Sequence, residues 1–205
     1  MVISYAILCH SETDSLRDLI EVVYQNKQKQ DEIVIVADTT STDETLGILT
    51  EYKEKYNIIW EKHSLNKDFA QQKNYLNSLC SGRYIFNLDA DELPPKYLLD
   101  NIHIICSEND CDLYWVPRVN TVDGLTQEHI NKWRWQVNEK GWVNWPDYQS
   151  RIIQNSPKIK WQNKVHEQII GFSTRGVLPT EEQWCLYHPK DIKRQEVQNN
   201  FYDSL

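Results

Sequence analysis

Short apolar runs alternate with segments of helical spacing through the first 117 residues of the chain. Between the runs, apolar residues recur every three or four positions, as Leu16, Leu19, Ile20 and Val23 do, which predicts amphipathic helices. The runs are continuous enough for strands buried on both faces of a sheet, and they occupy residues 2–9, 33–37, 57–61, 83–88 and 112–117. This order predicts an α/β fold with a mainly parallel sheet flanked by helices.

Three of the predicted helices begin with residues suited to a helix start. Residues 41–44 (STDE) have the order of a capping box. Asp68 and Gln71 form a second capping pair. Pro94-Pro95 suits the first turn of a further helix, because proline fixes a helical φ and needs no hydrogen-bond partner there.

The pattern changes beyond residue 117. From about Asn120 strands and helices no longer alternate, and seven of the eight tryptophans lie beyond residue 110. Short strands are predicted at 149–154 and 184–187, and a polar helix at 190–202. Because no clear linker separates the parts, we predict one domain over residues 1–205, with two halves at 1–117 and 118–205.

Composition and charge exclude several classes of protein. A net charge of −8 argues against nucleic acid as a partner. No stretch approaches the roughly 18 apolar residues that span a bilayer, and the first apolar run has no basic segment before it, so we expect no signal peptide. Five cysteines without a CxxC pair favour a reducing, cytoplasmic setting. The charge is uneven, since residues 1–129 carry 11 basic and 22 acidic side chains and residues 130–205 carry 11 and 8.

Three acidic residues, Asp89, Asp91 and Glu92, follow the fourth predicted strand. Like charges this close repel unless a cation neutralises them. Asp89 and Asp91 point to one side in extended backbone, and carboxylate oxygens suit Mg²⁺ or Mn²⁺. A calcium loop of the EF-hand kind is excluded, because Glu92 stands where its glycine would be. A solvated acidic turn is the alternative interpretation.

Parallel sheets bind ligands outside the carboxyl ends of their strands. Two further segments with polar side chains lie there, namely His10-Ser11-Glu12 after the first strand and Asp38 after the second. An acid in the position of Asp38 can hold a nucleobase N–H or a ribose hydroxyl. The chain contains neither GxGxxG nor GxxxxGK[ST], so a dinucleotide-binding fold or a P-loop lacks its signature.

Three segments in order resemble the nucleotide-binding half of family 2 glycosyltransferases. They are IVIVADTTSTDETL at 33–46, NKDFAQQKN at 66–74 and YIFNLDADE at 84–92. The most similar type is the branch of lipopolysaccharide-core β-glucosyltransferases, whose later elements resemble Arg151-Ile152-Ile153, Trp161, Val165-His166-Glu167 and His188. The chain departs from the family in its first loop, in Thr40 where glycine is frequent, and in lacking an evident Glu-Asp pair for the catalytic base.

The resemblance implies a GT-A fold, which is a Rossmann-like α/β architecture. Residues 1–117 would bind the nucleotide sugar, and residues 118–205 would form a small mixed acceptor-side region. The implied reaction is an inverting, metal-assisted transfer from a nucleoside-diphosphate sugar, with UDP-sugars favoured, to a hydroxyl of a glycan or lipid-linked acceptor in lipopolysaccharide or polysaccharide biosynthesis. The implied cofactor is Mn²⁺ or Mg²⁺. The expected location is the cytoplasm, with peripheral association at the inner membrane surface as an open alternative.

The resemblance and the residue chemistry assign candidate roles. The base for the acceptor proton is Glu167, with Glu92 second; an ion pair with Lys164 or Arg151 is the alternative for Glu167. The metal ligands are Asp91, Asp89 and His188, and Asp89 also suits the ribose or a metal-bound water. The donor-binding candidates are His10, Glu12, Asp38, Asn66, Lys67, Lys73, Asp89, Asp91 and Arg151. The acceptor-binding candidates are Trp142, Trp145 and His166, since an aromatic face complements the C–H face of a sugar.

Two other functions compete with the transferase. A non-catalytic module of the same fold would hold a nucleotide or glycan without turnover, and the missing Glu-Asp pair favours it. A nucleotidyltransferase that makes nucleotide sugars would need a glycine-rich, basic first loop. Residues 10–14 are acidic and free of glycine, which argues against that class.

Overall fold

A mostly parallel sheet runs through the centre of the protein. The computed structural model describes residues 1–203. The sheet has eight strands in the order β10-β5-β6-β4-β1-β2-β3, with β9 paired to β5. Their bounds are Ile3–Cys9 for β1, Glu32–Asp38 for β2, Ile59–His63 for β3, Tyr84–Asp89 for β4, Leu113–Asp123 for β5, Val143–Gln154 for β6, Arg175–Val177 for β9 and Leu186–Asp191 for β10.

One strand of this sheet runs against the others. β6 pairs antiparallel with β4 on one side and with β5 on the other, so β5 runs parallel to β4 without pairing with it. The strand–helix order predicted a parallel sheet, and β6 is the exception because it folds back along β5 and takes the place beside β4. The mainly parallel α/β class is confirmed.

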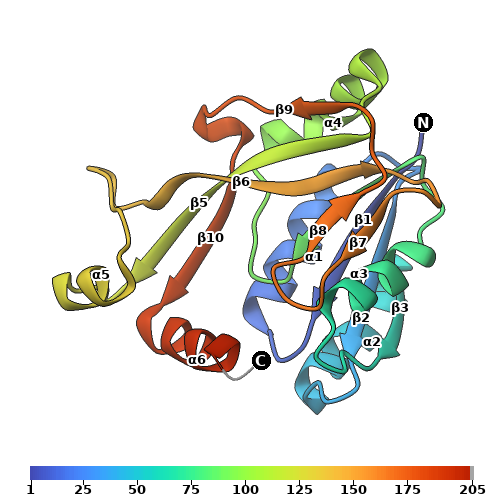
Figure 1. The fold of residues 1–205 in the computed structure, drawn as a ribbon. Coiled ribbons are helices and arrows are strands. Elements are labelled where there is room, and N and C mark those ends of the chain that lie inside the picture. The colour runs from blue at the N-terminus through green and yellow to red at the C-terminus, as the bar shows by residue number, and fades with distance from the viewer. Residues whose placement is uncertain (204–205) are drawn as a thin grey trace.

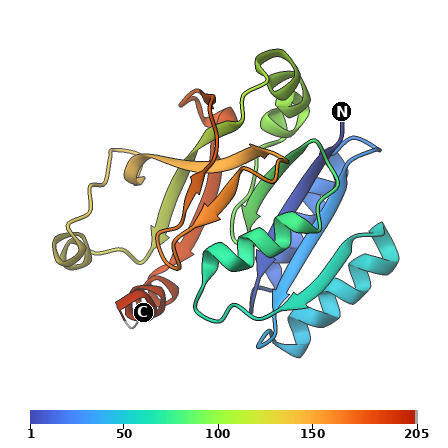
Figure 2. The same cartoon turned by 45° about the vertical axis from the view of Figure 1, so that its right-hand side comes forward.

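Helices and a small hairpin cover the two faces of the sheet (Figures 1 and 2). α1, α2 and α4 pack on one face, and α3 packs on the other with the hairpin of β7 and β8. No helix within residues 1–203 is long and apolar enough to cross a lipid bilayer. The bounds are Asp14–Asn26 for α1, Asp43–Tyr56 for α2, Phe69–Ser78 for α3, Lys96–Asn109 for α4, Gln127–Trp133 for α5, Ile192–Asp203 for α6, Glu182–Trp184 for the 3-10 turn η1, Lys160–Gln162 for β7 and Gln168–Ile170 for β8.

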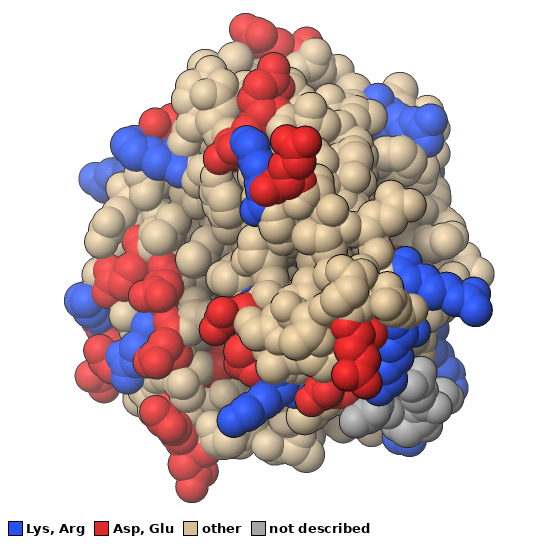
Figure 3. Space-filling model, turned by 90° about the vertical axis from the view of Figure 1, so that its left-hand side faces the viewer, with Lys and Arg blue, Asp and Glu red and all other residues tan. Residues whose placement is uncertain are grey.

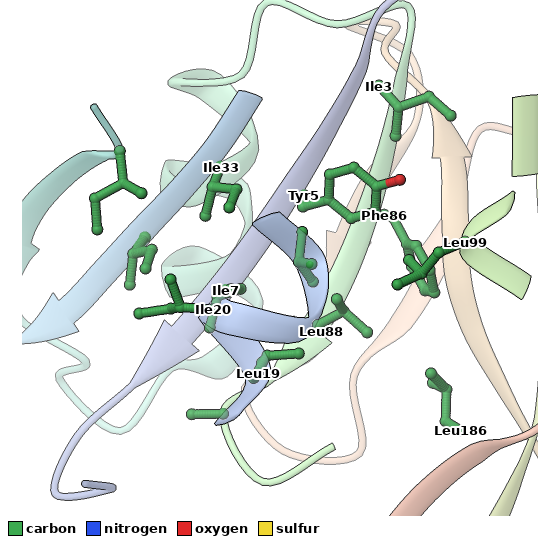
Figure 4. Packing of buried hydrophobic residues seen from close by; sticks show 14 of the residues in the cluster. Ile3, Tyr5, Ile7, Leu19, Ile20, Ile33, Phe86, Leu88, Leu99 and Leu186 are labelled. Carbon is green, nitrogen blue, oxygen red and sulfur yellow. The ribbon is translucent and has the colours of Figure 1, made fainter. Parts of the chain in front are cut away.

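Alternate residues of the central strands build a hydrophobic core on each face. On the face of α1, α2 and α4, Tyr5 and Phe86 pack with ring centroids 6.0 Å apart (Figure 4). On the face of α3, Ala6 and Ile85 pack in one cluster with Trp161 of β7. Burial on both faces explains why these strands appear in the sequence as continuous apolar runs.

α3 begins at its predicted cap, and α2 begins one residue later than the predicted capping box places it, with Thr42 as the cap instead of Ser41. The hydroxyl of Thr42 accepts a hydrogen bond from the amide of Thr45 at the start of α2. The carboxylate of Asp68 accepts one from the amide of Gln71 at the start of α3. These bonds satisfy amides that have no partner inside the helix, and they fix the loops after β2 and β3 at the carboxyl edge of the sheet.

Several strand boundaries differ from the prediction, among them the start of β6 at Val143 instead of residue 149. β5 continues past Pro117 to Asp123, because β6 pairs with it on one side and β10 on the other. β10 begins at Leu186, and Trp184 belongs to the preceding η1 turn instead. The extension of β5 carries Arg118 and Asn120 to the carboxyl edge, which affects the site described next.

Candidate active site

A cleft of about 1100 Å³ opens at the carboxyl ends of the parallel strands, where such sheets bind ligands. Its walls come from both halves of the chain, so the residues that face it are brought together by the fold. Most of the predicted site residues line it, namely His10, Glu12, Asp38, Lys73, Asp89, Asp91, Arg151, His166, Glu167 and His188.

Asp38, at the end of β2, is fixed by the loops around it. Its Oδ1 accepts hydrogen bonds from the amide and hydroxyl of Thr40, and its Oδ2 accepts one from the amide of Leu65 at 2.7 Å. Burial opposes ionisation of Asp38, but these bonds outweigh it and lower its pKa. Nε2 of His10 lies 2.9 Å from Oγ1 of Thr40, so the loop after β1 adjoins this anion.

Asp91 lies among basic side chains of β10 and α6. Its Oδ2 is 3.2 Å from Nε2 of His188, 3.1 Å from Nη2 of Arg194 and 3.9 Å from Nζ of Lys190. Burial opposes ionisation of Asp91, but the hydrogen bond with His188 and the nearby positive charges lower its pKa to about 2. Asp91 is therefore an anion at neutral pH. Burial in turn lowers the pKa of Lys190.

Asp89 and Glu92 hold the guanidinium of Arg151 between them. Nη2 of Arg151 lies 2.6 Å from Oδ2 of Asp89 and also pairs with Oε1 of Glu92. Glu92 accepts further bonds from Nη1 of Arg118 at 2.9 Å and from the amide of Asp89 at 3.1 Å. Burial opposes ionisation of Asp89, but the charges of Arg151, Lys73 and Arg118 outweigh it and lower its pKa.

This arrangement bears on two predicted roles. Glu92 is 0% exposed and paired with two guanidinium groups, which favours a structural role over that of a second base. Arg151 is 2% exposed and binds carboxylates of its own chain. This favours a structural role, in which it holds the acidic loop in place, over the predicted role in donor binding. The loop that carries Asp91 thus rests on a buried cluster of charges, in which opposite charges satisfy one another.

Three residues that the sequence did not single out extend this cluster. Arg118 donates to Oδ2 of Asp147 from Nε at 2.9 Å and from Nη2 at 2.8 Å. Nδ2 of Asn120 donates to the same oxygen at 2.8 Å. Arg118 and Asn120 lie on the part of β5 beyond Pro117, and Asp147 lies on β6. No local motif marks them, because their positions follow from strand pairing. On the surface of the protein as well, acidic and basic side chains lie next to one another, as the face drawn in Figure 3 shows.

The same hydrogen bonds orient the ring of His188. Because the amide nitrogen of Asn120 faces Asp147, its oxygen faces Nδ1 of His188 at 2.7 Å. An amide oxygen only accepts, so Nδ1 carries a proton and Nε2 of a neutral ring holds a lone pair. Nε2 is the atom that faces Asp91.

Asp91 and His188 are the two side chains that would hold a divalent metal ion at this place. A neutral His188 would aim its lone pair at the Asp91 carboxylate, so the 3.2 Å contact requires a proton or a metal ion between them. Carboxylate and imidazole are both ligands of transition metals. Within residues 1–203 no group of three or more His, Cys, Asp or Glu side chains is placed to hold a metal, so an ion here would take further bonds from its substrate. Asp89, the other predicted ligand, is engaged by Arg151.

Glu167 forms an ion pair with Lys73 of α3. Nζ of Lys73 also lies 4.4 Å from the centroid of the Trp161 ring, on β7. An ion pair was the alternative expected for Glu167, and the partner is Lys73 instead of Lys164 or Arg151. Glu167 still borders the cleft, together with Lys73 and Trp161.

Besides the buried Glu92, four of the predicted residues do not line the cleft. Asn66 and Lys67 have positive φ angles, of 47° and 57°, in the loop between β3 and α3. Trp142 and Trp145 line a separate pocket of about 840 Å³, together with Glu181 and Glu182. Their ring centroids are 4.7 Å apart. An acceptor role for these tryptophans therefore requires a site apart from the cleft.

The sequence model described as "Glycosyl transferase family 2" matches residues 4–174. The chain belongs to this family. Within it, the chain is 28% identical over 116 residues to the poly(ribitol-phosphate) beta-glucosyltransferase of Bacillus spizizenii, covering 55% of this chain and 18% of the relative. It is also 28% identical over 103 residues to the poly-beta-1,6-N-acetyl-D-glucosamine synthase of Staphylococcus aureus, covering 48% of this chain and 25% of the relative.

The crystal structure of S. aureus TarS 1-349 in complex with UDP-GlcNAc is similar to this family 2 chain. The TM-score is 0.68 at 16% sequence identity, over 93% of this chain and 59% of TarS 1-349. This similarity confirms the predicted GT-A fold. The chain therefore spans only a part of the curated relatives that it matches, namely 18% of the glucosyltransferase and 25% of the synthase. The family is shown, and the lipopolysaccharide-core branch stays a prediction.

Proposed function

We propose that this family 2 chain moves a sugar from a nucleoside-diphosphate sugar, with UDP-sugars favoured, to a hydroxyl of a glycan or lipid-linked acceptor. The observation that carries the proposal is the convergence of Asp38, Asp91 and His188 on one cleft. The family match and relatives named as a glucosyltransferase and a synthase support a transferase. The TarS complex with UDP-GlcNAc supports a nucleotide sugar as donor.

On the donor side, Asp38 would accept a hydrogen bond from a nucleobase N–H or a ribose hydroxyl. Its two oxygens are already fixed by Thr40 and Leu65, so it needs no rearrangement to present its charge. Asp91 and His188 would hold Mn²⁺ or Mg²⁺. When bound, such an ion neutralises charge on a departing diphosphate.

On the acceptor side, Glu167 is the proposed base. The acceptor hydroxyl gives its proton to Glu167 while its oxygen bonds to the anomeric carbon, on the face opposite the diphosphate. The bond from that carbon to the diphosphate oxygen breaks, and the electron pair leaves with the diphosphate. The sugar passes through an oxocarbenium-like transition state, and the configuration inverts. The ion pair with Lys73 fixes the position of Glu167.

The wider context is proposed from the resemblance and the relatives' names. A role in polysaccharide or lipopolysaccharide biosynthesis accords with relatives named as a poly(ribitol-phosphate) beta-glucosyltransferase and a poly-beta-1,6-N-acetyl-D-glucosamine synthase. We place the reaction in the cytoplasm, with peripheral association at the inner membrane surface as its variant. We also propose that residues 1–205 act as one domain, since strands from both halves share one sheet.

Calorimetric titration of UDP, GDP, TDP and CDP, each with Mn²⁺ and with EDTA, tests the donor site. We expect one diphosphate to bind in a metal-dependent manner, and Asp91→Ala to abolish that binding. Asp100→Ala is the matched control, because Asp100 is exposed on α4 and pairs only with Lys96 among the described ion pairs. Binding by none of the four diphosphates, or unchanged binding by Asp91→Ala, would contradict the proposal.

A non-catalytic binding module is the second candidate. The observation that favours it is that both predicted bases are ion-paired, Glu92 with two arginines and Glu167 with Lys73. Incubation with radiolabelled nucleotide sugars separates the two functions. Release of nucleoside diphosphate with transfer or hydrolysis of the sugar supports the enzyme, and binding without turnover supports the module.

A further inference from the structure

Helix α6 brings a guanidinium group onto the proposed metal ligand. Nη2 of Arg194 lies 3.1 Å from Oδ2 of Asp91 and 3.0 Å from Oε1 of Glu12. Glu12 follows β1 and is 182 residues away in sequence. Figure 1 shows α6 at the end of the sheet toward which β1 and β10 point. The last helix is thus joined to the first loop across the cleft.

Arg194 and a divalent metal compete for the same oxygen. Mg²⁺ sits about 2.1 Å from its oxygen ligands, and Oδ2 of Asp91 is the atom that faces both His188 and Arg194. A dication there would lie within a few ångströms of the guanidinium, where like charges repel strongly. Arg194 therefore has to leave Asp91 when a metal binds.

Arg194 can make this movement. Its side chain is 38% exposed, whereas that of Lys190, the other cation near Asp91, is 6% exposed. The contact with Glu12 leaves Arg194 attached beside the cleft after Asp91 is released. A planar guanidinium also matches two phosphate oxygens at once, which a lysine ammonium does not.

We propose that Arg194 is an exchangeable counter-ion of the donor site. It neutralises Asp91 in the donor-free protein, and it turns to the diphosphate when a metal–nucleotide complex takes Asp91 and His188. This inference rests on the proposed function, because it assumes a metal–diphosphate donor. It assigns α6 a part in donor binding that the family match, which ends at residue 174, does not cover.

The proposal predicts effects of opposite sign for one substitution. Arg194→Gln removes the competitor for Asp91, so Mn²⁺ alone should bind about three- to tenfold more tightly, as measured by the electron paramagnetic resonance signal of free Mn²⁺. The same variant loses a charged hydrogen bond to phosphate, so Mn²⁺–UDP should bind about ten- to a hundredfold more weakly by calorimetry. If another diphosphate binds the wild type better, it replaces UDP.

Two variants serve as controls. Lys193→Gln removes the same charge from the neighbouring, exposed position of α6 and should change neither affinity. Arg194→Lys keeps the charge without the planar group, so it should leave Mn²⁺ affinity near the wild-type value and still weaken Mn²⁺–UDP. Circular dichroism checks that each variant is folded.

The outcomes separate this inference from the proposed function. If the wild type binds neither Mn²⁺ nor any Mn²⁺–diphosphate, both are overturned. If the wild type binds the complex and Arg194→Gln shifts both affinities in one direction, or matches Lys193→Gln, the counter-ion proposal is overturned and the proposed function stands.

Discussion

Nε2 of His188 lies 3.2 Å from Oδ2 of Asp91, although 97 residues separate them along the chain. β10 carries His188 and the loop after β4 carries Asp91, and these elements meet where Leu93 pairs with Tyr187. Asp147 and Asn120 orient the ring so that Nε2 faces the carboxylate. The position of His188 beside Asp91 is therefore fixed by the strand pairing and by the side chains behind the ring.

Removing the group that orients His188 should weaken metal binding. In Asn120→Ala, Nδ1 of His188 loses its acceptor, and the ring is free to rotate or change tautomer. Partners of this kind are worth about 10- to 100-fold in metal affinity. Titration with Mn²⁺ in the presence of the preferred diphosphate measures the change. Asn109→Ala, on an exposed residue of α4 whose side chain donates only to the carbonyl of Ile105 in the hydrogen bonds described, should leave the affinity unchanged.

Replacing the proposed base should lower the rate and keep donor binding. Glu167→Gln retains the size of the side chain but cannot accept the acceptor proton, so kcat should fall by about 10²- to 10⁴-fold. Calorimetry should show diphosphate affinity within about threefold of wild type, since Glu167 is bound to Lys73 and not to the proposed metal ligands. Glu108→Gln, on the surface of α4, is the control. Unchanged turnover in Glu167→Gln would remove this residue as the base.

The buried guanidinium of Arg151 should stabilise the fold. Arg151→Met leaves Asp89 and Glu92 without their shared partner, and breaking a buried pair in this way costs about 3–5 kcal/mol of the free energy of unfolding. Arg83→Met removes an exposed ion pair with Asp110 and should cost about 0–1 kcal/mol. Urea denaturation measures both. Equal costs for the two variants would show that the buried cluster is not stabilising.

Glu21 should make stability depend on pH in the acid range. Hydrogen bonds from Tyr56, then Lys55 and Tyr52, lower its pKa from 4.5 to about 2. Because the folded pKa is below the unfolded value, this stabilisation is present above about pH 4.5 and is lost as pH falls toward 2. Glu21→Gln should thus lower the free energy of unfolding at pH 7 by about 1 kcal/mol, and by less at pH 3.

A matched substitution controls for the loss of one surface carboxylate. Glu51→Gln removes an exposed acid of α2 that pairs with Arg17, and it should leave the pH dependence close to that of the wild type. Urea denaturation at pH 3, 5 and 7 compares the three proteins. A Glu21→Gln profile parallel to that of the wild type would contradict the assignment to Glu21.

Local patterns were enough to place three of the cleft's acids at the carboxyl edge of the sheet. A strand that is buried on both faces has a continuous apolar sequence, and the polar residue that follows such a strand lies at the carboxyl edge of the sheet. Asp38, Asp89 and Asp91 were therefore found from the sequence. The cap Asp68 was also found, because a cap acts on an amide only three residues away, whereas the cap of α2 is Thr42, one residue after the Ser41 of the predicted box.

The partners of those residues were decided by the order of strands in the sheet. β6 enters between β4 and β5 and places Asp147 beside Arg118, while β10 pairs with the extension of β5 and places His188 beside Asn120. The sequence pattern within one strand does not indicate which strand will pair with it, because strand pairing depends on packing between residues far apart in the chain.

The sequence by itself determined the α/β class, the carboxyl edge as the edge that carries the cleft, and the acids that line it. Only the tertiary structure decided that Asp89 binds Arg151, that Asp91 meets His188 and Arg194, and that Trp142 and Trp145 lie apart from the cleft. The physical reason is one of range. Burial and capping act within a few residues, whereas charge pairing acts between any groups that the fold brings within a few ångströms.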